Sequence, residues 1–167
     1  MTDTLHPMNC QVRLVFECMK TKIARDIISK CATIPVIRYV AFDKVKLLAA
    51  DFLPNEIPAI QLIDVNMTSV HEAARAKKTW RIALEILMRG DQSGAVSQND
   101  LWNLENEVLR KLWADPGLSS VNQGGSGGKV IQMNFVGSQT DLHLLEPYYF
   151  SRLDFDVLFY EDLVRSC

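Results

Sequence analysis

One segment of the sequence, Lys77 to Met88, constrains the fold most because its residues alternate strictly in character. Trp80, Ile82, Leu84, Ile86 and Met88 alternate with Thr79, Arg81, Ala83, Glu85 and Leu87. Side chains on a β-strand point alternately to opposite faces of the sheet, so a period of two predicts a strand. One face of this strand is expected to be buried, and the other is mixed. Arg89-Gly90 ends the pattern, since glycine and the polar residues after it favour a turn.

Two amphipathic helices are predicted, and each carries an apolar stripe that must pack on something. The first runs from about Met8 to Ser29, with Val12, Phe16, Met19, Ile23 and Ile27 on one face. The second begins after Ser97, a residue type favoured as N-cap, and ends at Asp115-Pro116, because proline cannot continue a helix. Its stripe consists of Leu101, Leu104, Val108 and Leu112, and is widened by Trp102, Leu109 and Trp113.

Four further strands are expected, at Val36 to Phe42, Ile57 to Asp64, Lys129 to Val136 and Tyr149 to Tyr160. Pro58 favours the start of a strand or an edge position, because proline donates no ladder hydrogen bond. Ile131, Met133 and Phe135 are expected on one face of the third of these strands. In the last, Leu153, Phe155, Val157 and Phe159 point inward, while Arg152, Asp154 and Asp156 point outward.

Two connecting segments show no such periodicity. Val65 to Ala76 is expected to be a loop, or to hold a short helix around Val70 to Ala76. Ser119 to Gly128 is flexible by composition. The order of elements predicts an α/β (α+β) fold, a mostly antiparallel β-sheet with two main helices packed on one face. Residues 1–167 are expected to form a single domain, as a chain of this length commonly does.

Composition excludes several classes of protein. The net charge of −2 gives no basic excess of the kind that nucleic-acid binding as a main activity requires. No signal peptide and no membrane-spanning run is recognisable, and the protein is expected to stay inside a cell. No CxxC pair occurs and His71 and His143 lie far from the cysteines, so neither a metal site nor a cofactor is expected. The cysteines and histidines are Cys10, Cys18, Cys31, Cys167, His6, His71 and His143.

Three local patterns contain residue types that can take part in catalysis or ligand binding. Gly124 to Lys129 resembles a phosphate loop in composition, but its lysine opens a strand, whereas a true P-loop lysine opens a helix. The basic residues Arg75, Lys77, Lys78 and Arg81 indicate either the solvated start of a strand or a contact with an acidic partner or passing DNA.

The third pattern is the pair Asp154 and Asp156, with Arg152 beside it. A solvated strand face explains these residues as well as acid–base chemistry does. No Gly-x-Ser-x-Gly elbow occurs. Trp80, Trp102 and Trp113 fall on apolar faces and are expected in the core. The sequence thus gives no support for an enzyme, and catalytic residues are expected to be absent.

In combination, these features resemble the tail-terminator proteins of long-tailed bacteriophages, the lambda-like family. The matching features are the N-terminal helix, the Ile57-Pro58-Ala59 strand start, the long strand from Lys77 to Met88, the helix that ends at Asp115-Pro116 and the final strand at Leu153 to Tyr160. The Gly124–Gly128 insertion departs from the shorter members of the family.

The resemblance implies a virion protein of the phage tail, assembled in the host cytoplasm. Its members form a hexameric ring at the head-proximal end of the tail, stop tail-tube polymerisation and present the head or neck joining surface. Implied partners are further copies of the chain, the tail tube protein, a neck or head-completion protein and, in a contractile tail, a sheath protein. DNA passes through the ring, and no membrane is involved.

In the family, the loop before the long strand and the sheet edges contact neighbouring subunits. Carried onto this sequence, this implies subunit-interface candidates at Met67, His71, Arg75, Lys77, Lys78 and Arg81. Arg81→Glu is accordingly expected to weaken ring formation more than folding. Another head–tail neck or connector protein, a non-viral protein-interaction domain and an unrecognised enzyme are the alternatives, in that order.

Overall fold

A computed structural model describes residues 18–42, 46, 51–90, 98–123, 127–141 and 147–162. Two main helices and five strands make up most of this part of the chain, together with two short helical segments. In order, the elements are α2 (Met19–Ala32), β1 (Tyr39–Phe42), the 3-10 segment η2 (Pro54–Glu56), β2 (Ala59–Glu72), β3 (Arg75–Arg89), α3 (Gln98–Trp113), α4 (Ser119–Gln123), β4 (Gly128–Asp141) and β5 (Tyr148–Asp162).

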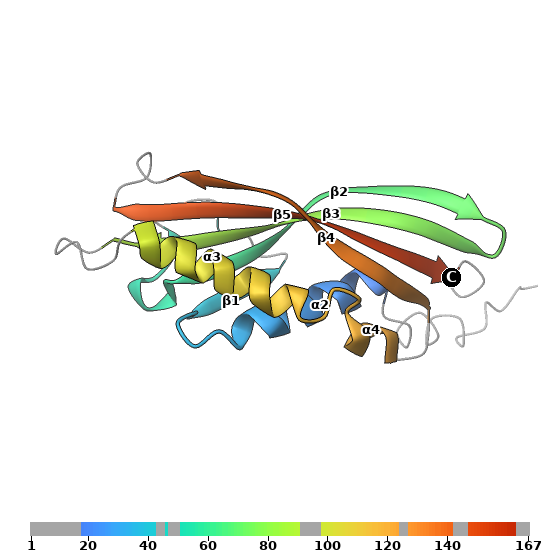
Figure 1. The fold of residues 1–167 in the computed structure, drawn as a ribbon, viewed down its shortest axis with the longest axis horizontal. Coiled ribbons are helices and arrows are strands. Elements are labelled where there is room, and N and C mark those ends of the chain that lie inside the picture. The colour runs from blue at the N-terminus through green and yellow to red at the C-terminus, as the bar shows by residue number, and fades with distance from the viewer. Residues whose placement is uncertain are drawn as a thin grey trace, which may run out of the picture.

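The strands form one five-stranded sheet in the order β1-β2-β3-β5-β4. β1 and β2 run parallel, and the three other neighbouring pairs are antiparallel. The helices α2, α3 and α4 lie on one side of this twisted sheet (Figure 1). The predicted fold class, a mostly antiparallel sheet with two main helices on one face, is therefore confirmed.

The core lies between the helices and the sheet, and it holds most of the predicted stripes. Met19, Ile23 and Ile27 of α2 are buried, as is the stripe Leu101, Leu104, Val108 and Leu112 of α3. The sheet contributes the inward positions of β3 and β5, which are Trp80, Ile82, Leu84, Ile86, Met88, Leu153, Phe155, Val157 and Phe159. Each fully buried large apolar side chain contributes about 1.5–3 kcal/mol, so this layer is the main source of stability.

Several predicted boundaries lie elsewhere in the structure. The expectation of a loop or short helix at Val65 to Ala76 is wrong, because β2 continues to Glu72 and turns at Ala73 into β3. Every residue of β2 from Asp64 onward is exposed. A strand with two exposed faces needs no alternation, so its sequence carries no period. β2 does begin directly after Pro58, as predicted.

The first predicted strand begins three residues later than expected, at Tyr39. Ile34 to Val36 forms a turn, in which the backbone N–H of Ile37 donates to the carbonyl of Ile34 at 3.1 Å. Ile34 is buried but Val36 is 53% exposed. The first predicted helix is confirmed from Met19 to Ser29 and extends to Ala32, whereas Met8 to Glu17 and the N-cap candidate Ser97 lie outside the described residues.

The glycine-rich segment contains more structure than its composition predicts. Ser119–Gln123 forms the short helix α4, in which the backbone N–H of Ser119 donates to Asp115 Oδ2 at 3.0 Å. Gly128 then opens β4 so close to β5 that a Cβ there would lie 2.1 Å from the Tyr160 carbonyl oxygen. Residues 124–126 lie outside the described residues.

β4 departs from the predicted alternation because it contains two register shifts, between Val130 and Gln132 and between Phe135 and Gly137. A bulge inserts one residue and reverses the side-chain direction after it. Met133 is buried and Phe135 half-buried as expected, but Ile131 is 39% exposed, so its predicted place on their face is wrong. In the described ranges, no helix is long and apolar enough to cross a bilayer.

Candidate assembly interface

The two ends of β2 differ in their neighbours, and the difference leaves a strand edge open. β1 pairs only with Ala59 to Leu62 of β2. From Asp64 to Glu72, β2 is paired with β3 on one side, and no other described strand pairs with it on the opposite side. We call Asp64 to Glu72 the free β2 edge. Unpaired strand edges present backbone N–H and C=O groups to any strand that can reach them.

The free β2 edge carries little of the protection usual on exposed edges. Its sequence, Asp-Val-Asn-Met-Thr-Ser-Val-His-Glu, contains no lysine and no proline. A register shift lies between Asp64 and Asn66, and the pairing with β3 is regular beyond it. Three large apolar side chains are exposed here, Val65, Met67 and Val70. This combination is typical of an edge that another chain covers.

The six interface candidates from the sequence fall into two groups. Met67 and His71 lie exposed on the free β2 edge. Arg75, Lys77, Lys78 and Arg81 lie on β3, which is an interior strand of the sheet. The structure thus places only the first two candidates on an edge.

The basic residues of β3 do not form one cluster. Lys78 pairs with Glu161. Arg81 forks onto Asp156, with Nε to Oδ1 and Nη2 to Oδ2 both at 2.8 Å. Lys77 and Arg75 have no ion pair among the described residues; the Arg75 guanidinium lies 4.2 Å from the centre of the Tyr160 ring.

The carboxylates of β5 belong to a network of ion pairs on the face of the sheet opposite the helices. Arg152 Nε donates to Asp154 Oδ1 at 3.1 Å. Hydrogen bonds from Arg81 hold the pKa of Asp156 below its usual range. Burial raises the pKa of Glu85, which the Arg152 guanidinium only partly offsets. The arrangement agrees with a solvated strand face, the simpler interpretation of Asp154 and Asp156.

Neither a reactive cysteine nor a metal site is indicated among the described residues. Burial raises the pKa of the Cys31 thiol to about 12, so this cysteine is not a nucleophile at neutral pH. Within the described part of the chain, no group of three or more histidine, cysteine, aspartate or glutamate side chains could hold a metal ion.

A second exposed apolar group lies at the other edge of the sheet, on α3 and β4. The sequence did not predict it. Trp102 and Trp113 were expected in the core, but they are 45% and 54% exposed. They lie eleven positions apart on α3, about three helical turns, and therefore share a face about 100° from the buried stripe. Trp80, in contrast, is fully buried as expected.

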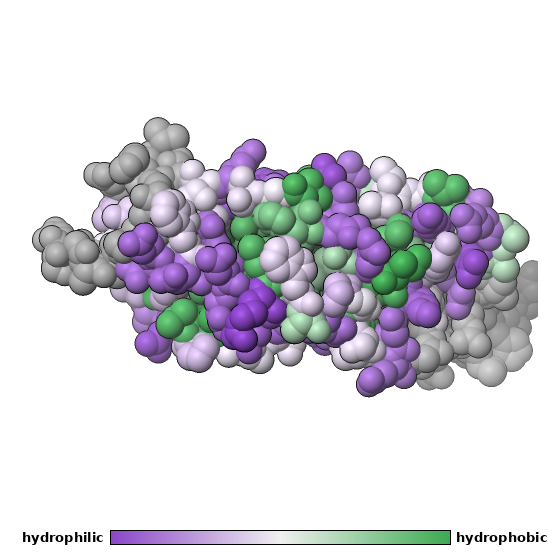
Figure 2. All heavy atoms as spheres, viewed as in Figure 1, coloured by the Kyte–Doolittle hydropathy of each residue, from purple (hydrophilic) through white to green (hydrophobic). Residues whose placement is uncertain are grey.

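This second group continues onto β4. The Trp113 ring packs edge-on against Phe135, with ring centres 6.1 Å apart, and Glu105 of α3 contacts Thr140 of β4. Ile131 and Val136 are exposed on the same strand. Among the described strands, β4 pairs with β5 alone and is the last strand of the sheet. We call Trp102, Trp113, Ile131 and Val136 the β4 side. On the face shown in Figure 2, hydrophobic residues form separate patches between polar ones.

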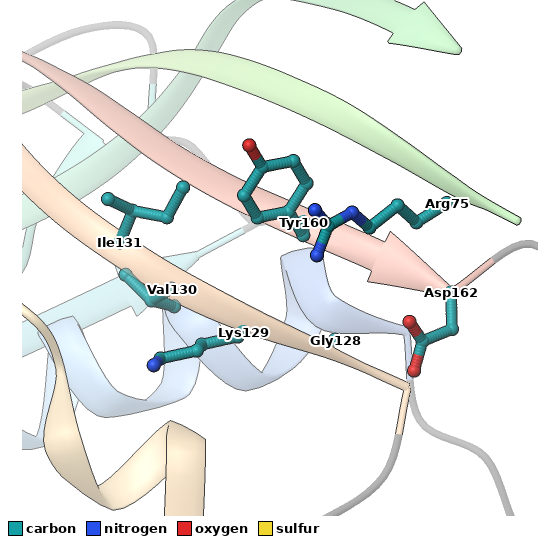
Figure 3. A pocket seen from close by; sticks show the side chains of 7 residues that line it. All are labelled: Arg75, Gly128, Lys129, Val130, Ile131, Tyr160 and Asp162. Atoms are coloured by element: carbon teal, nitrogen blue, oxygen red, sulfur yellow. The ribbon is translucent and has the colours of Figure 1, made fainter. Parts of the chain in front are cut away.

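The surface of the described residues includes two hollows. One, of about 740 Å³, lies between the start of α3, the turn at Ile34 to Val36 and the Ile57-Pro58 peptide. The other, of about 440 Å³, lies at the far end of β3, β4 and β5 around Tyr160 (Figure 3). Neither brings together a nucleophile and a base in the manner of an active site.

Comparisons with known proteins identify no family. No family model matches the chain, and no curated protein matches it. Among solved structures, a chain from the virion of a native gene transfer agent (GTA) particle is similar over 86% of this chain and 92% of its own length. The two chains are 10% identical, with a TM-score of 0.45.

Proposed function

We propose that this chain is a structural protein of a phage virion, a single tail-terminator-like domain spanning residues 1–167. Copies of it form a ring at the head-proximal end of the tail, end tail-tube polymerisation and provide the head or neck joining surface. The order of elements supports this proposal, because the confirmed fold contains the helix, the long strand and the final strand on which the sequence resemblance rests. The single observation that carries assembly is the pair of open sheet sides.

The two open sides differ from one another, and this difference favours a ring. The free β2 edge and the β4 side lie at different strands of the same sheet and carry different residues. An interface between two unlike surfaces is head-to-tail, and it closes into a ring when the rotation between subunits permits. An interface between two copies of the same edge gives a dimer instead.

A structural role also agrees with the charged groups. On the outer face of β3 and β5, Arg81 pairs with Asp156 and Arg152 pairs with Asp154. Within the described part of the chain, these carboxylates are thus held by structural ion pairs on an open strand face and not in a cleft. We therefore propose a protein without catalytic activity and without a cofactor. Its partners are further copies, the tail tube protein, a neck or head-completion protein and, in a contractile tail, a sheath protein.

Three exposed valines allow a matched test of this proposal. Val70 lies on the free β2 edge and is 61% exposed, Val136 lies on the β4 side and is 49% exposed, and Val36 lies on neither and is 53% exposed. Each is replaced by lysine, and the mass of each protein is measured by size-exclusion chromatography with light scattering, alone and with tail tube protein.

Wild type and the control Val36→Lys should form the ring. Val70→Lys and Val136→Lys should each remain monomeric, because each has lost one of the two unlike surfaces. A mixture of these two variants should give a dimer, since one intact β2 edge can still meet one intact β4 side. Dimers of Val136→Lys alone would contradict the head-to-tail arrangement. Imaging of purified tails then separates a terminator from a neck protein by the position of the chain.

A further inference from the structure

Three basic residues, Arg75, Lys77 and Lys129, occupy neighbouring register positions of the sheet near the turn between β2 and β3. Lys77 of β3 and Lys129 of β4 are both register partners of Tyr160 on β5. Directly opposed residues of antiparallel strands share a face, so the three side chains form one row. Phe159 next to Tyr160 points into the core, which places this row on the opposite face. Arg75 lies two residues before Lys77 and therefore shares its face.

These cations differ from the other basic residues of the long strand. Lys78 and Arg81 are neutralised by Glu161 and Asp156. For Arg75, Lys77 and Lys129, the described part of the chain provides no ion pair. The sequence showed only a run on one strand, whereas the sheet divides this run and adds Lys129 from a distant segment.

Carboxylates are present nearby but leave the row charged. Glu72 and Asp162 are the register partners of Arg75, and neither forms an ion pair with it. Figure 3 shows the Arg75 guanidinium beside the Tyr160 ring, whereas the Asp162 carboxylate points away from it. Because Glu72 and Asp162 both adjoin Arg75, they offset part of its positive charge. Lys77 and Lys129 therefore contribute more to the positive potential of this face than Arg75 does.

We propose that the row Lys77, Tyr160 and Lys129, together with Arg75, binds phosphates of double-stranded DNA. Neighbouring strands lie about 4.8 Å apart, which places the backbones of the two lysines roughly 10 Å from each other. Arg75 lies about 7 Å from Lys77 along the strand. Charges at such intervals fit a polyanion better than a single anion. Lysine, arginine and tyrosine are all common donors to DNA phosphates.

The shape of the surface favours duplex DNA over an acidic peptide. Tyr160 stands on β5, which is paired on both sides, so no strand edge is available at the centre of the row for strand addition. The hollow beside Tyr160 is lined by residues of β3, β4 and β5 (Figure 3). The exposed sheet face around Tyr160 is broad, and duplex DNA is a broad, rigid polyanion that can lie across it. This face adjoins the two assembly surfaces, since Lys77 is the register partner of Val70 and Ile131 lines the hollow. The whole row lies within one chain, so the inference does not depend on formation of the ring.

The test uses the full chain and a short fluorescein-labelled DNA duplex, with binding measured by fluorescence anisotropy from about 50 to about 200 mM salt. The variant Lys77→Gln/Lys129→Gln removes two charges from the row. Its matched control, Arg38→Gln/Arg89→Gln, removes two exposed charges that also have no ion pair among the described residues but lie elsewhere. Light scattering of the same samples reports ring formation separately.

Wild type and control should bind the duplex with a clear salt dependence. The lysine variant should bind on the order of a hundredfold more weakly at the lowest salt, and its log–log salt slope should fall by about 1.8, which is roughly 0.9 for each lost phosphate contact. Equal losses of DNA affinity in variant and control would overturn the proposal. It would also be overturned if poly-glutamate of matched charge displaced the labelled duplex as well as unlabelled DNA does. Ring formation without DNA binding refutes only this inference, and DNA binding without a ring refutes only the proposed function.

Discussion

The two halves of β2 have the same partner strand and opposite surroundings. Ala59 to Leu62 is buried throughout, whereas Asp64 to Glu72 is exposed throughout, although both halves pair with β3. The first half also pairs with β1 and packs in the core with α2. The second half extends beyond β1. Burial is therefore decided by what covers a strand, and a strand without cover is a surface for another chain.

A polar contact marks the boundary between the halves. Trp80 Nε1 donates to Asp64 Oδ1 at 2.7 Å, and Lys20 of α2 pairs with the same carboxylate. Burial would raise the pKa of Asp64, but the hydrogen bonds from Lys20 and Trp80 hold it below its usual range. The indole N–H of the buried Trp80 thus has a hydrogen-bond acceptor at Asp64, where the exposed half of β2 begins.

The core layer between the helices and the sheet should respond most strongly to the loss of a side chain. Phe155 is 1% exposed and packs against Phe135, with ring centres 5.5 Å apart. Phe155→Ala should lower the free energy of unfolding by about 3–5 kcal/mol, because it leaves a cavity under the helices. Urea denaturation followed by tryptophan fluorescence measures the loss. A loss below about 1 kcal/mol would show that this layer is not packed as described.

Gly128 tests how closely β4 and β5 approach each other at the end of the sheet nearest the turn between β2 and β3. In Gly128→Ala the new methyl group would lie 2.1 Å from the Tyr160 carbonyl oxygen, and backbone would have to move. We expect a loss of about 1–3 kcal/mol in unfolding free energy, as for overpacking elsewhere. Gly137→Ala is the matched control, because a Cβ there meets no atom within 4 Å. Equal stability of the two variants would contradict the close approach.

Arg81 distinguishes the outer face of the sheet from its edges. Arg81→Glu replaces both hydrogen bonds to Asp156 with repulsion between carboxylates, so the urea midpoint should fall, though less than in Phe155→Ala. From the sequence, this variant was expected to weaken assembly more than folding. Because the structure places Arg81 on an interior strand, we now expect ring formation to survive. Loss of the ring in light scattering, with folding kept, would assign the outer face to the interface.

Glu85 of β3, the register partner of Gln61 in the covered half of β2, should make the free energy of unfolding depend on pH. Burial raises its pKa above the usual 4.5, so the folded state holds the proton more tightly than the unfolded state does. Its contribution to stability is therefore present below that pH and declines as pH rises through the raised value. Glu85→Gln should remove this decline, and wild type should not exceed it in stability at pH 7. Urea unfolding at several pH values, with exposed Glu72→Gln as control, checks this.

The smallest effect on folding is expected on the uncovered half. Val70→Lys should change the free energy of unfolding by less than about 0.5 kcal/mol, because the side chain is exposed in the monomer. The same substitution should abolish assembly. A large loss of monomer stability would show that the free β2 edge is covered within its own chain, and it would remove the difference between the two halves.

Sequence patterns predicted the elements that face the core. The alternation in β3 and β5 and the stripes of α2 and α3 each have one buried and one solvated face, so burial leaves a period in the sequence. The interface candidates Met67 and His71 came from the family resemblance, and they do lie on an exposed edge. The exposed Trp102 and Trp113 could not be predicted, because an apolar residue beside a buried stripe has the same sequence pattern whether or not another element covers it.

The sequence by itself determined which segments form helices and strands in the core, since local spacing sets which side chains can be buried together. Only the tertiary structure decided which side chains meet across the sheet. Lys129 and Lys77 are both register partners of Tyr160, and Asp156 neutralises Arg81, because strand order and register bring distant segments together. The open edge of β2 likewise results from how far β1 extends along it. No local pattern records the length of a neighbouring strand.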